Sequence, residues 1–276
     1  RSVIKSFKPN FIFHLAAEAI VQRSYKNPKK TWETNTLGTI NILESLKDYN
    51  KKVTVVVITS DKVYKNLEIS RGYKEDDSLG NIDPYSASKA SADLAAQSYI
   101  KSFLVKNKNI KISIARAGNV IGGGDWAQGR LIPDCIRSWS KNRIVLLRNP
   151  KSTRPWQHVL DVLHGYIKLA INLNKNKKIN GEAFNFGPKI EKNNEVINVV
   201  KKMQSYWNKA RWKLDLNKKF YESNLLHLNS SKANKLLKWK CKLNLNKTIL
   251  FTISWYKYFY KYPKNIYNYS ILQLNQ

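Results

Sequence analysis

Four polar residues able to donate hydrogen bonds or transfer protons follow directly on an apolar, β-branched segment. The segment is 53–58, and the residues after it are Thr59, Ser60, Asp61 and Lys62. A carboxylic acid beside a lysine at the end of a strand can act as an acid–base pair. The same residues also suit an ordinary polar strand exit. They therefore form a candidate catalytic site whose reaction remains open at this point.

Tyr85 and Lys89 form a second pair with acid–base potential. Residues i and i+4 share one face of a helix, so the ammonium group can lie near the phenol and favour the phenolate. A tyrosine with its ordinary pKa of about 10 needs such help to accept a proton near neutral pH. Two further Tyr-x-x-x-Lys matches begin at Tyr25 and Tyr260, but each has a proline inside it, which disfavours a helix there. Only Tyr85 follows both a strand and a polar exit.

Alternating strands and helices are expected to position these side chains. Short apolar or β-branched runs predict buried strands, and leucines and isoleucines at helical spacing predict an amphipathic helix. Asp83 as N-cap and Pro84 at the first helical position predict the start of another helix. The alternation is typical of an α/β fold with a doubly wound parallel sheet. The predicted strands are 10–17, 53–60, 110–115 and 182–186, and the predicted helices among them are 34–46 and 83–103.

The regular pattern weakens after Gly118. Glycines at 122–124 and several prolines interrupt it, and the Lys- and aromatic-rich tail has helical stretches at 231–237 and 245–260. We therefore expect a smaller, C-terminal substrate-binding lobe beside the sheet. The expected division assigns 1–118 and 158–187 to the sheet domain and assigns 119–157 and 188–276 to the lobe.

Composition narrows the classes of partner. The 276 residues carry a net charge of +30, and 42% are hydrophobic. The lysines are scattered among asparagines without an Arg-rich tract, so a nucleic-acid partner is not expected, although a positive field attracts a diphosphate-bearing substrate. The longest apolar run is too short for a membrane span, and two cysteines are too few for a disulfide framework. We expect a soluble cytoplasmic protein without a membrane partner; a basic, non-enzymatic binding protein is the competing interpretation.

No metal site is expected. His158, Asp161 and His164 would spread over a wide helical arc, and the sequence shows no further ligand near them.

Motifs in order along nearly the whole chain resemble one family. The strings Asn-Val-Ile-Gly-Gly-Gly-Asp-Trp and Arg-Pro-Trp-Gln-His are specific, whereas Tyr-x-x-x-Lys is shared more widely. The family is that of the extended short-chain dehydrogenase/reductases acting on nucleotide sugars, and the resemblance is strongest to its sugar 4,6-dehydratases, with CDP-glucose as the expected substrate. The matching stretches are 14–17, 34–39, 59–64, 83–89, 116–126, 130–134, 148–150, 154–158, 181–188 and 226–232.

The resemblance implies a redox-neutral dehydration that uses NAD. Tyr85 would take the C4 hydroxyl proton, assisted by Lys89, and Ser60 would hydrogen-bond the sugar at C4. Lys62 would remove the C5 proton while Asp61 protonates the departing C6 hydroxyl. Relatives acting on other nucleotide sugars have Glu in place of Lys62. A lysine must be neutral to act as a base, so burial or a nearby cation would be needed; a charged Lys62 would act electrostatically.

The resemblance also implies binding residues and an assembly. Asn119, Arg130 and Arg154 match positions that hold the nucleotide diphosphate, for which guanidinium and amide donors are suited. A homodimer through the helix of Tyr85 is a further expectation. The residues expected to bind the cofactor are Leu15, Ala16, Ala17, Thr59, Tyr85 and Lys89.

The sequence departs from the family at its beginning. It starts with Arg1 and contains no G-x-G-x-x-G fingerprint, which in this fold binds the cofactor pyrophosphate. We therefore expect an N-terminally truncated chain that is inactive or poorly soluble alone. A nucleotide-sugar epimerase or reductase of the same fold is the alternative; the Asp61–Lys62 pair argues against it, since epimerisation requires no acid to expel the C6 hydroxyl.

Overall fold

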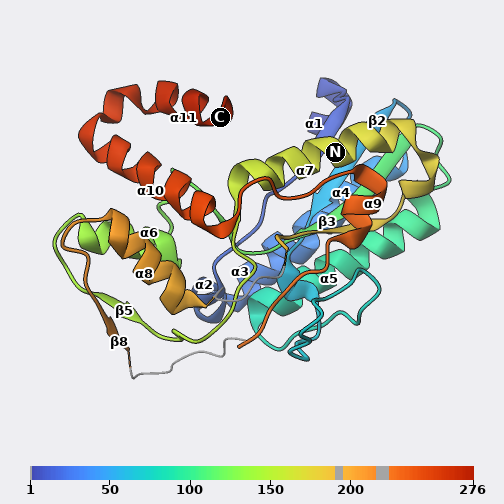
Figure 1. Ribbon diagram of the computed structural model, residues 1–276. Helices are drawn as coiled ribbons and strands as arrows, with labels where there is room; N and C mark the ends of the chain where they lie inside the picture. Colours follow the sequence, from blue (N-terminus) through green and yellow to red (C-terminus); the bar gives the residue numbers. More distant parts are fainter. Residues whose placement is uncertain (1, 190–194, 216–223) are drawn as a thin grey trace.

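A four-stranded parallel sheet lies at the centre of the computed structural model, which describes residues 2–189, 195–215 and 224–276. The strand order is β1–β2–β3–β7, and all neighbouring pairs are parallel (Figure 1). This confirms the predicted α/β class, with strand ends a few residues from the predicted ones. The strands are β1 (Phe11–His14), β2 (Val53–Ile58), β3 (Ile110–Ala117) and β7 (Ala183–Phe186).

Helices cover both faces of β2, which explains its continuous apolar sequence. Val55 and Val57 lie in a core cluster with residues of α4 and α5, whereas Val56 packs with residues of α7 on the opposite face. All three valines are fully buried. A strand buried on both faces has no polar alternation, which is why the run 53–58 indicated a central parallel strand. The helices of this unit are α1 (Ser2–Phe7), α2 (Val21–Lys26), α3 (Pro28–Trp32), α4 (Gly38–Lys47), α5 (Pro84–Tyr99), α7 (Val159–Lys175) and α9 (Ser231–Leu237).

The two predicted helices before β3 both form. A π-helical segment, Glu33–Leu37, joins α3 to α4, so helix runs almost without interruption from Pro28. The α5 helix begins as predicted, because the Asp83 side chain accepts a hydrogen bond from the Ser86 amide and Pro84 is the first helical residue. It continues into a π-helical segment, Ile100–Leu104.

A second packing unit lies beside the sheet. Its core contains Trp139 of α6, Met203 of α8 and Tyr256 of α10, all almost fully buried. The long α10–α11 hairpin forms the red arm at the upper left of Figure 1. The elements are β4 (Val120–Ile121) paired with β6 (Gln157–His158), β5 (Val145–Leu147) paired with β8 (Trp212–Leu214), α6 (Leu131–Trp139), α8 (Val196–Tyr206), α10 (Leu245–Lys261) and α11 (Ile266–Leu274).

One part of the expected lobe packs elsewhere. The α9 helix and Trp239, both within 188–276, lie in the core cluster beside the sheet with Phe186. Residues 190–194 and 216–223 of that range lie outside the described residues. The α9 segment therefore belongs to the packing of the sheet unit, and the division into domains stays a prediction. In the described part of the chain, every helix is too short or too polar to cross a bilayer.

Candidate active site

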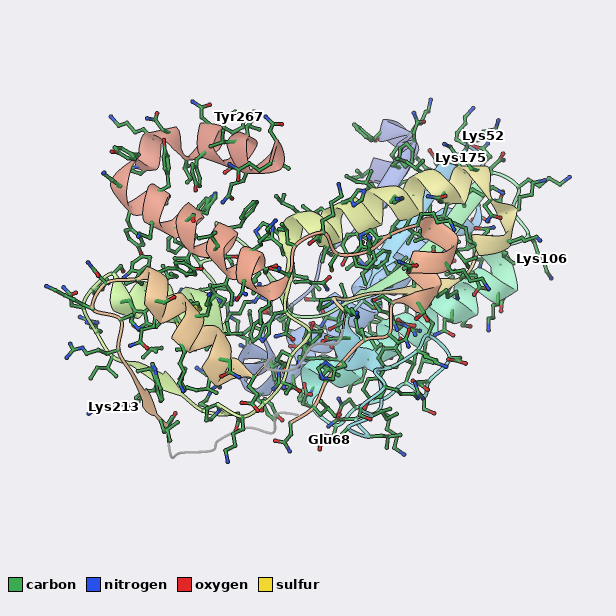
Figure 2. The ribbon with its side chains drawn as sticks, in the orientation of Figure 1. Lys52, Glu68, Lys106, Lys175, Lys213 and Tyr267 are labelled. Carbon is green, nitrogen blue, oxygen red and sulfur yellow. The ribbon has the colours of Figure 1, made fainter. Side chains whose placement is uncertain are left out.

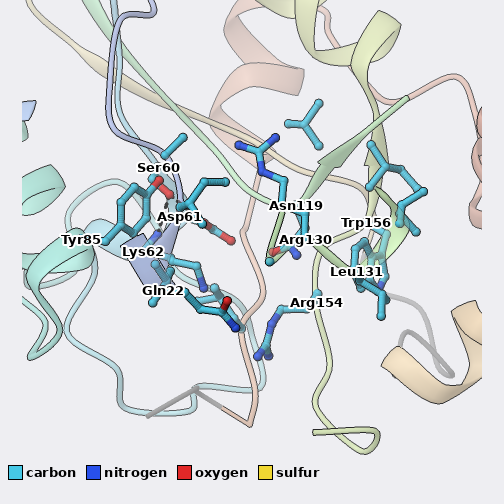
Figure 3. A pocket seen from close by; sticks show the side chains of 18 of the residues that line it. Gln22, Ser60, Asp61, Lys62, Tyr85, Asn119, Arg130, Leu131, Arg154 and Trp156 are labelled. Atoms are coloured by element: carbon cyan, nitrogen blue, oxygen red, sulfur yellow. Dashed lines mark hydrogen bonds between the residues drawn. The ribbon is translucent and has the colours of Figure 1, made fainter. Parts of the chain in front are cut away.

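The carboxyl ends of the parallel strands meet at one edge of the sheet, where ligands bind in folds of this kind. A cavity of about 470 Å³ opens there. Ser60, Asp61 and Lys62 reach it from the exit of β2, and Tyr85 reaches it from the first turn of α5 (Figure 3). The structure thus brings together four of the five predicted catalytic residues in one cavity.

A short 3₁₀ turn, Asp61–Val63, aims the acid and the lysine. Ser60 caps the turn: its hydroxyl oxygen accepts a hydrogen bond from the Lys62 amide (3.2 Å) and its hydroxyl donates to Asp61 Oδ1 (3.0 Å). Lys62 is half-buried and lines the cavity. The turn thereby fixes Asp61 and Lys62 side by side on the cavity wall.

The Asp61 carboxyl is buried and only partly satisfied. Its side chain is 1% exposed, and its Oδ2 has no hydrogen-bond partner among the described residues. Burial raises the pKa of Asp61, and the charges of Lys62 and Arg154 and the hydrogen bond from Ser60 only partly oppose this effect. A carboxyl in this environment retains its proton to higher pH than usual and can serve as an acid.

Tyr85 and Lys89 share one face of α5 at the end of β2. Burial raises the pKa of Tyr85 to about 12, against the opposing effects of a hydrogen bond with Ser60 and the charge of Arg130. Lys89 donates from Nζ to the carbonyl oxygen of Ile58 (3.0 Å). Burial lowers the pKa of Lys89 to about 8, although the Asp93 carboxylate opposes this shift.

All three predicted substrate-binding residues line the same cavity, opposite Tyr85 and the exit of β2 (Figure 3). Arg154 is 6% exposed and donates from Nη1 to the carbonyl oxygen of Thr153 (2.7 Å). Arg130 forms an ion pair with Asp125 (2.8 Å). Asn119 lies directly after β3 with a positive φ of 38°. Two guanidinium groups facing one cavity make a suitable environment for a diphosphate.

The cavity contains residues to which the sequence assigned no role. Gln22 and Arg148 lie at its edge, and in the amide orientation that satisfies both groups the Gln22 oxygen accepts from Arg148 Nη2 (3.1 Å). The two residues are far apart along the chain, so no local pattern signals the contact. Asp125, which forms the ion pair with Arg130, belongs to the Gly-rich string 122–126. The sequence indicated this residue only as part of that motif and gave no sign of its contact with Arg130.

A buried ionic network connects the elements that carry the candidate catalytic residues. Arg116, 1% exposed, donates from Nε and Nη2 to the two carboxylate oxygens of Asp93 (2.8 and 2.7 Å). The Thr59 hydroxyl donates a hydrogen bond to Oδ2 of the same carboxylate (2.8 Å). The network joins β3, α5 and the exit of β2, and a bidentate buried pair of this kind is costly to break on one side.

Two of the six predicted cofactor residues, Thr59 and Tyr85, line the cavity. Its described lining does not include the other four, which are Leu15, Ala16, Ala17 and Lys89. Residues 15–17 follow β1, and Leu15 is 51% exposed. The segment after β1 is exposed and can contact a ligand. Lys89 has three N–H donors, of which one binds the Ile58 carbonyl oxygen, so the others can donate to a nicotinamide ribose. The role of these residues at the nicotinamide end of NAD stays a prediction.

The fold is that of the Rossmann-like NAD-dependent sugar dehydratases and epimerases. A dTDP-glucose 4,6-dehydratase from Bacillus anthracis in complex with NAD matches with a TM-score of 0.75 at 24% identity, covering 96% of this chain and 78% of that one. A UDP-glucuronic acid 4-epimerase from Bacillus cereus in complex with UDP-glucuronic acid and NAD matches with a TM-score of 0.78 at 21% identity, covering 93% of this chain and 77% of that one.

The sequence comparisons define the family more closely. CDP-glucose 4,6-dehydratase from Salmonella typhimurium is 43% identical over 262 residues, covering 93% of this chain and 73% of the relative. The family model described as GDP-mannose 4,6-dehydratase matches residues 1–250. The chain belongs to this family.

Proposed function

We propose that the protein is a CDP-glucose 4,6-dehydratase, a hydro-lyase that converts CDP-glucose to CDP-4-keto-6-deoxyglucose and water. The observation that carries the proposal is the placement of Asp61, Lys62 and Tyr85 on one cavity. An elimination needs a base and an acid besides the base that oxidation requires. The 43% identity to the Salmonella enzyme supports the choice of substrate.

NAD is the cofactor of the proposed reaction. Leu15, Ala16, Ala17 and Thr59 would hold its nicotinamide end together with Tyr85 and Lys89. The chemistry that NAD would supply there is reversible hydride acceptance, so that the overall reaction is redox-neutral.

Tyr85 and Ser60 act on the C4 hydroxyl in this proposal. Tyr85 accepts the hydroxyl proton as C4 is oxidised, and Ser60 hydrogen-bonds the oxygen. The pKa of about 12 that burial gives Tyr85 means that proton acceptance requires an additional positive charge nearby. Lys89, one turn away on the same helix face, is already present where this pKa holds, so its ammonium group would act together with the positive charge of bound NAD⁺.

Lys62 and Asp61 perform the elimination. The C4 ketone makes the C5 proton acidic, and Lys62, in its neutral form, removes it. Asp61 gives its proton to the departing C6 hydroxyl, which leaves as water. Burial raises the pKa of Asp61, which favours the protonated form that this step needs. The hydride taken from C4 would then return to C6 and a proton to C5, which gives the 4-keto-6-deoxy sugar.

The remaining side chains bind the nucleotide diphosphate. Arg130 and Arg154 donate to its phosphate oxygens, and Asn119 contributes an amide. The net charge of +30 attracts such an anion over longer distances. We further propose that the enzyme acts in the cytoplasm and forms a homodimer through α5 and its neighbour.

Turnover of CDP-glucose with added NAD tests the proposal. The 4-keto product is measured by its ultraviolet absorbance in alkali, with UDP-, dTDP- and GDP-glucose as comparison substrates. The proposal predicts rapid product formation from CDP-glucose once a G-x-G-x-x-G segment that binds the cofactor pyrophosphate is joined upstream of residue 1, with this chain alone measured beside it. An epimeric 4-hydroxy sugar as the product would instead support the epimerase alternative, and faster turnover of another nucleotide sugar would overturn the substrate.

A further inference from the structure

Gly118 lies against the carboxyl group of Asp61. A Cβ atom on Gly118 would fall 1.9 Å from Asp61 Oδ2, 2.3 Å from Cγ and 2.8 Å from Cβ. Real Cβ atoms do not approach other atoms this closely, so any side chain at 118 requires a movement. Because Asp61 Cβ is also too near, rotation of the carboxyl alone cannot relieve the clash.

Backbone conformation is not the reason for this glycine. The φ angle of Gly118 lies outside the left-handed region, so this angle does not itself require a glycine. The demand for a small residue therefore comes from the space that the Asp61 side chain occupies.

The backbone on both sides of the contact is held in place. The Gly118 carbonyl oxygen accepts a hydrogen bond from the fully buried Gln157 side chain (3.0 Å), which also donates to the Phe186 carbonyl oxygen (2.7 Å). On the other side, Ser60 caps the turn of Asp61, and the Gly80 amide donates to the Val63 carbonyl oxygen (2.8 Å). Little local movement is therefore available to relieve a clash. A side chain at 118 would strain or shift the turn that carries both Asp61 and Lys62.

We propose that Gly118 is a positioning residue for the acid–base pair, because its missing side chain leaves the space in which the Asp61 carboxyl lies. The inference rests on the proposed function for its catalytic consequence, but the contact itself does not. Gly118 also closes one side of the space around the unpartnered Asp61 Oδ2, which helps to keep water from that oxygen. The charged or titratable groups that face Asp61 are Lys62 on its own turn, Arg154 from the chain before β6, Tyr85 on α5 and Tyr166 on α7.

A double-mutant cycle tests the contact without turnover. Asp61→Gly removes the three atoms nearest to the new Cβ, which are Oδ2, Cγ and Cβ of Asp61. Gly118→Ala should lower the Tm by about 5 °C in the wild-type background, as expected for overpacking. It should lower the Tm by less than half as much in the Asp61→Gly background. An equal loss in both backgrounds would overturn the proposed contact, and a Gly118→Ala protein that folds only with Asp61→Gly would support it.

Steady-state kinetics test the catalytic consequence. Gly118→Ala should reduce kcat about 100-fold, the scale of an ångström-sized misplacement, with a much smaller change in KM. Displacement toward water lowers the pKa of the acid, so the alkaline limb of the kcat profile should move to lower pH. Gly38→Ala is the matched control, because its Cβ would meet only the Glu33 carbonyl oxygen at an ordinary 3.8 Å.

The outcomes separate the two proposals. Lost kcat and a shifted pH profile in Gly118→Ala, with Gly38→Ala unaffected, support the positioning role. Full activity in Gly118→Ala contradicts it. A wild-type protein that stays inactive even with a G-x-G-x-x-G segment joined upstream would overturn the proposed function and the catalytic role. A strong coupling in the double-mutant cycle would still leave the Gly118–Asp61 contact established.

Discussion

Lys89 donates a hydrogen bond from Nζ to the carbonyl oxygen of Ile58 across 3.0 Å, which joins the catalytic helix α5 to the last residue of β2. The bond holds the ammonium group at the sheet edge where the nicotinamide ribose is expected. It also anchors the helix that carries Tyr85. A methionine in place of Lys89 removes both the charge and the hydrogen bond, and the pH dependence of the remaining rate reports on the charge.

Lys89→Met is predicted to reduce kcat about 1,000-fold, within the range of acid–base contributions. Burial raises the pKa of Tyr85 to about 12. The substitution removes the cationic side chain one helical turn away, which we propose favours the phenolate when substrate and NAD are bound. The residual activity should therefore continue to rise with pH beyond the range in which the wild-type rate levels off. The kcat–pH profile measures this, and a residual rate that is independent of pH would refute the role.

Lys62→Met is predicted to stop exchange of the C5 hydrogen. If Lys62 is the base, the variant still binds CDP-glucose but loses about 1,000-fold in product formation, because no other group at this position removes the proton. Mass spectrometry of sugar recovered from ²H₂O detects exchange at C5. The exposed neighbour Lys65 gives the matched control, Lys65→Met, which should retain the wild-type rate. Undiminished C5 exchange in Lys62→Met would assign the base elsewhere.

Asp61→Asn is predicted to stabilise the folded protein near pH 7 while abolishing dehydration. Burial raises the folded-state pKa of Asp61 above that of the unfolded chain. The neutral Asp61 carboxyl therefore makes its full contribution to the free energy of unfolding at pH values below the unfolded-state pKa. This contribution is lost as the pH rises through the folded-state pKa. A neutral amide avoids that loss, so we expect a gain of about 1 kcal/mol, or about 2–4 °C in Tm, at pH 7.

The same comparison at acid pH provides the control. Below about pH 3, well under the unfolded pKa of about 3.9, the wild-type carboxyl is protonated in both states, and the difference in Tm between Asp61→Asn and wild type should disappear. A difference that is the same at about pH 3 and pH 7 would show that the carboxyl charge is not its cause.

Arg154→Gln is predicted to raise the KM for CDP-glucose about 10–100-fold with a smaller effect on kcat, the scale of a lost charged hydrogen bond. Arg154 is almost buried at the cavity wall, whereas Arg71 forms an exposed ion pair with Asp77. Arg71→Gln removes the same charge from the surface and should leave KM unchanged. Equal effects of the two substitutions would show that overall charge, rather than contact with the diphosphate, governs binding.

Much of the sheet unit was predictable because its signals are local. The β-branched run that became β2 is buried on both faces, and the Asp83–Pro84 start of α5 depends on neighbouring residues alone. The prolines inside the other Tyr-x-x-x-Lys matches also act locally: Pro28 begins a new helix, and α10 ends at Lys261, before Pro263. The sequence therefore identified the pair Tyr85–Lys89 correctly as the one within a continuous helix.

The parts that could not be predicted depend on contacts between distant residues. The strand pairs β4–β6 and β5–β8 are too short for a periodic signal, and the packing of α9 against β7 depends on how the chain returns to the sheet. Two relationships in the site are of this kind: Gln22 with Arg148, and Asp61 with Gly118. Their residue types carry no local signature. Side chains fill much of the space that the ribbon leaves open (Figure 2), and only the folded arrangement reveals which of them touch.

The fate of the C4 hydrogen tests the central claim most directly. The protein is incubated with NAD and CDP-glucose carrying deuterium at C4, and the product is analysed by NMR and mass spectrometry. A 4,6-dehydratase moves that deuterium to C6 of a 4-keto-6-deoxy sugar and takes the C5 hydrogen from solvent, as the positions of Tyr85, Lys62 and Asp61 predict. Deuterium retained at C4 of an epimeric hexose would contradict the account.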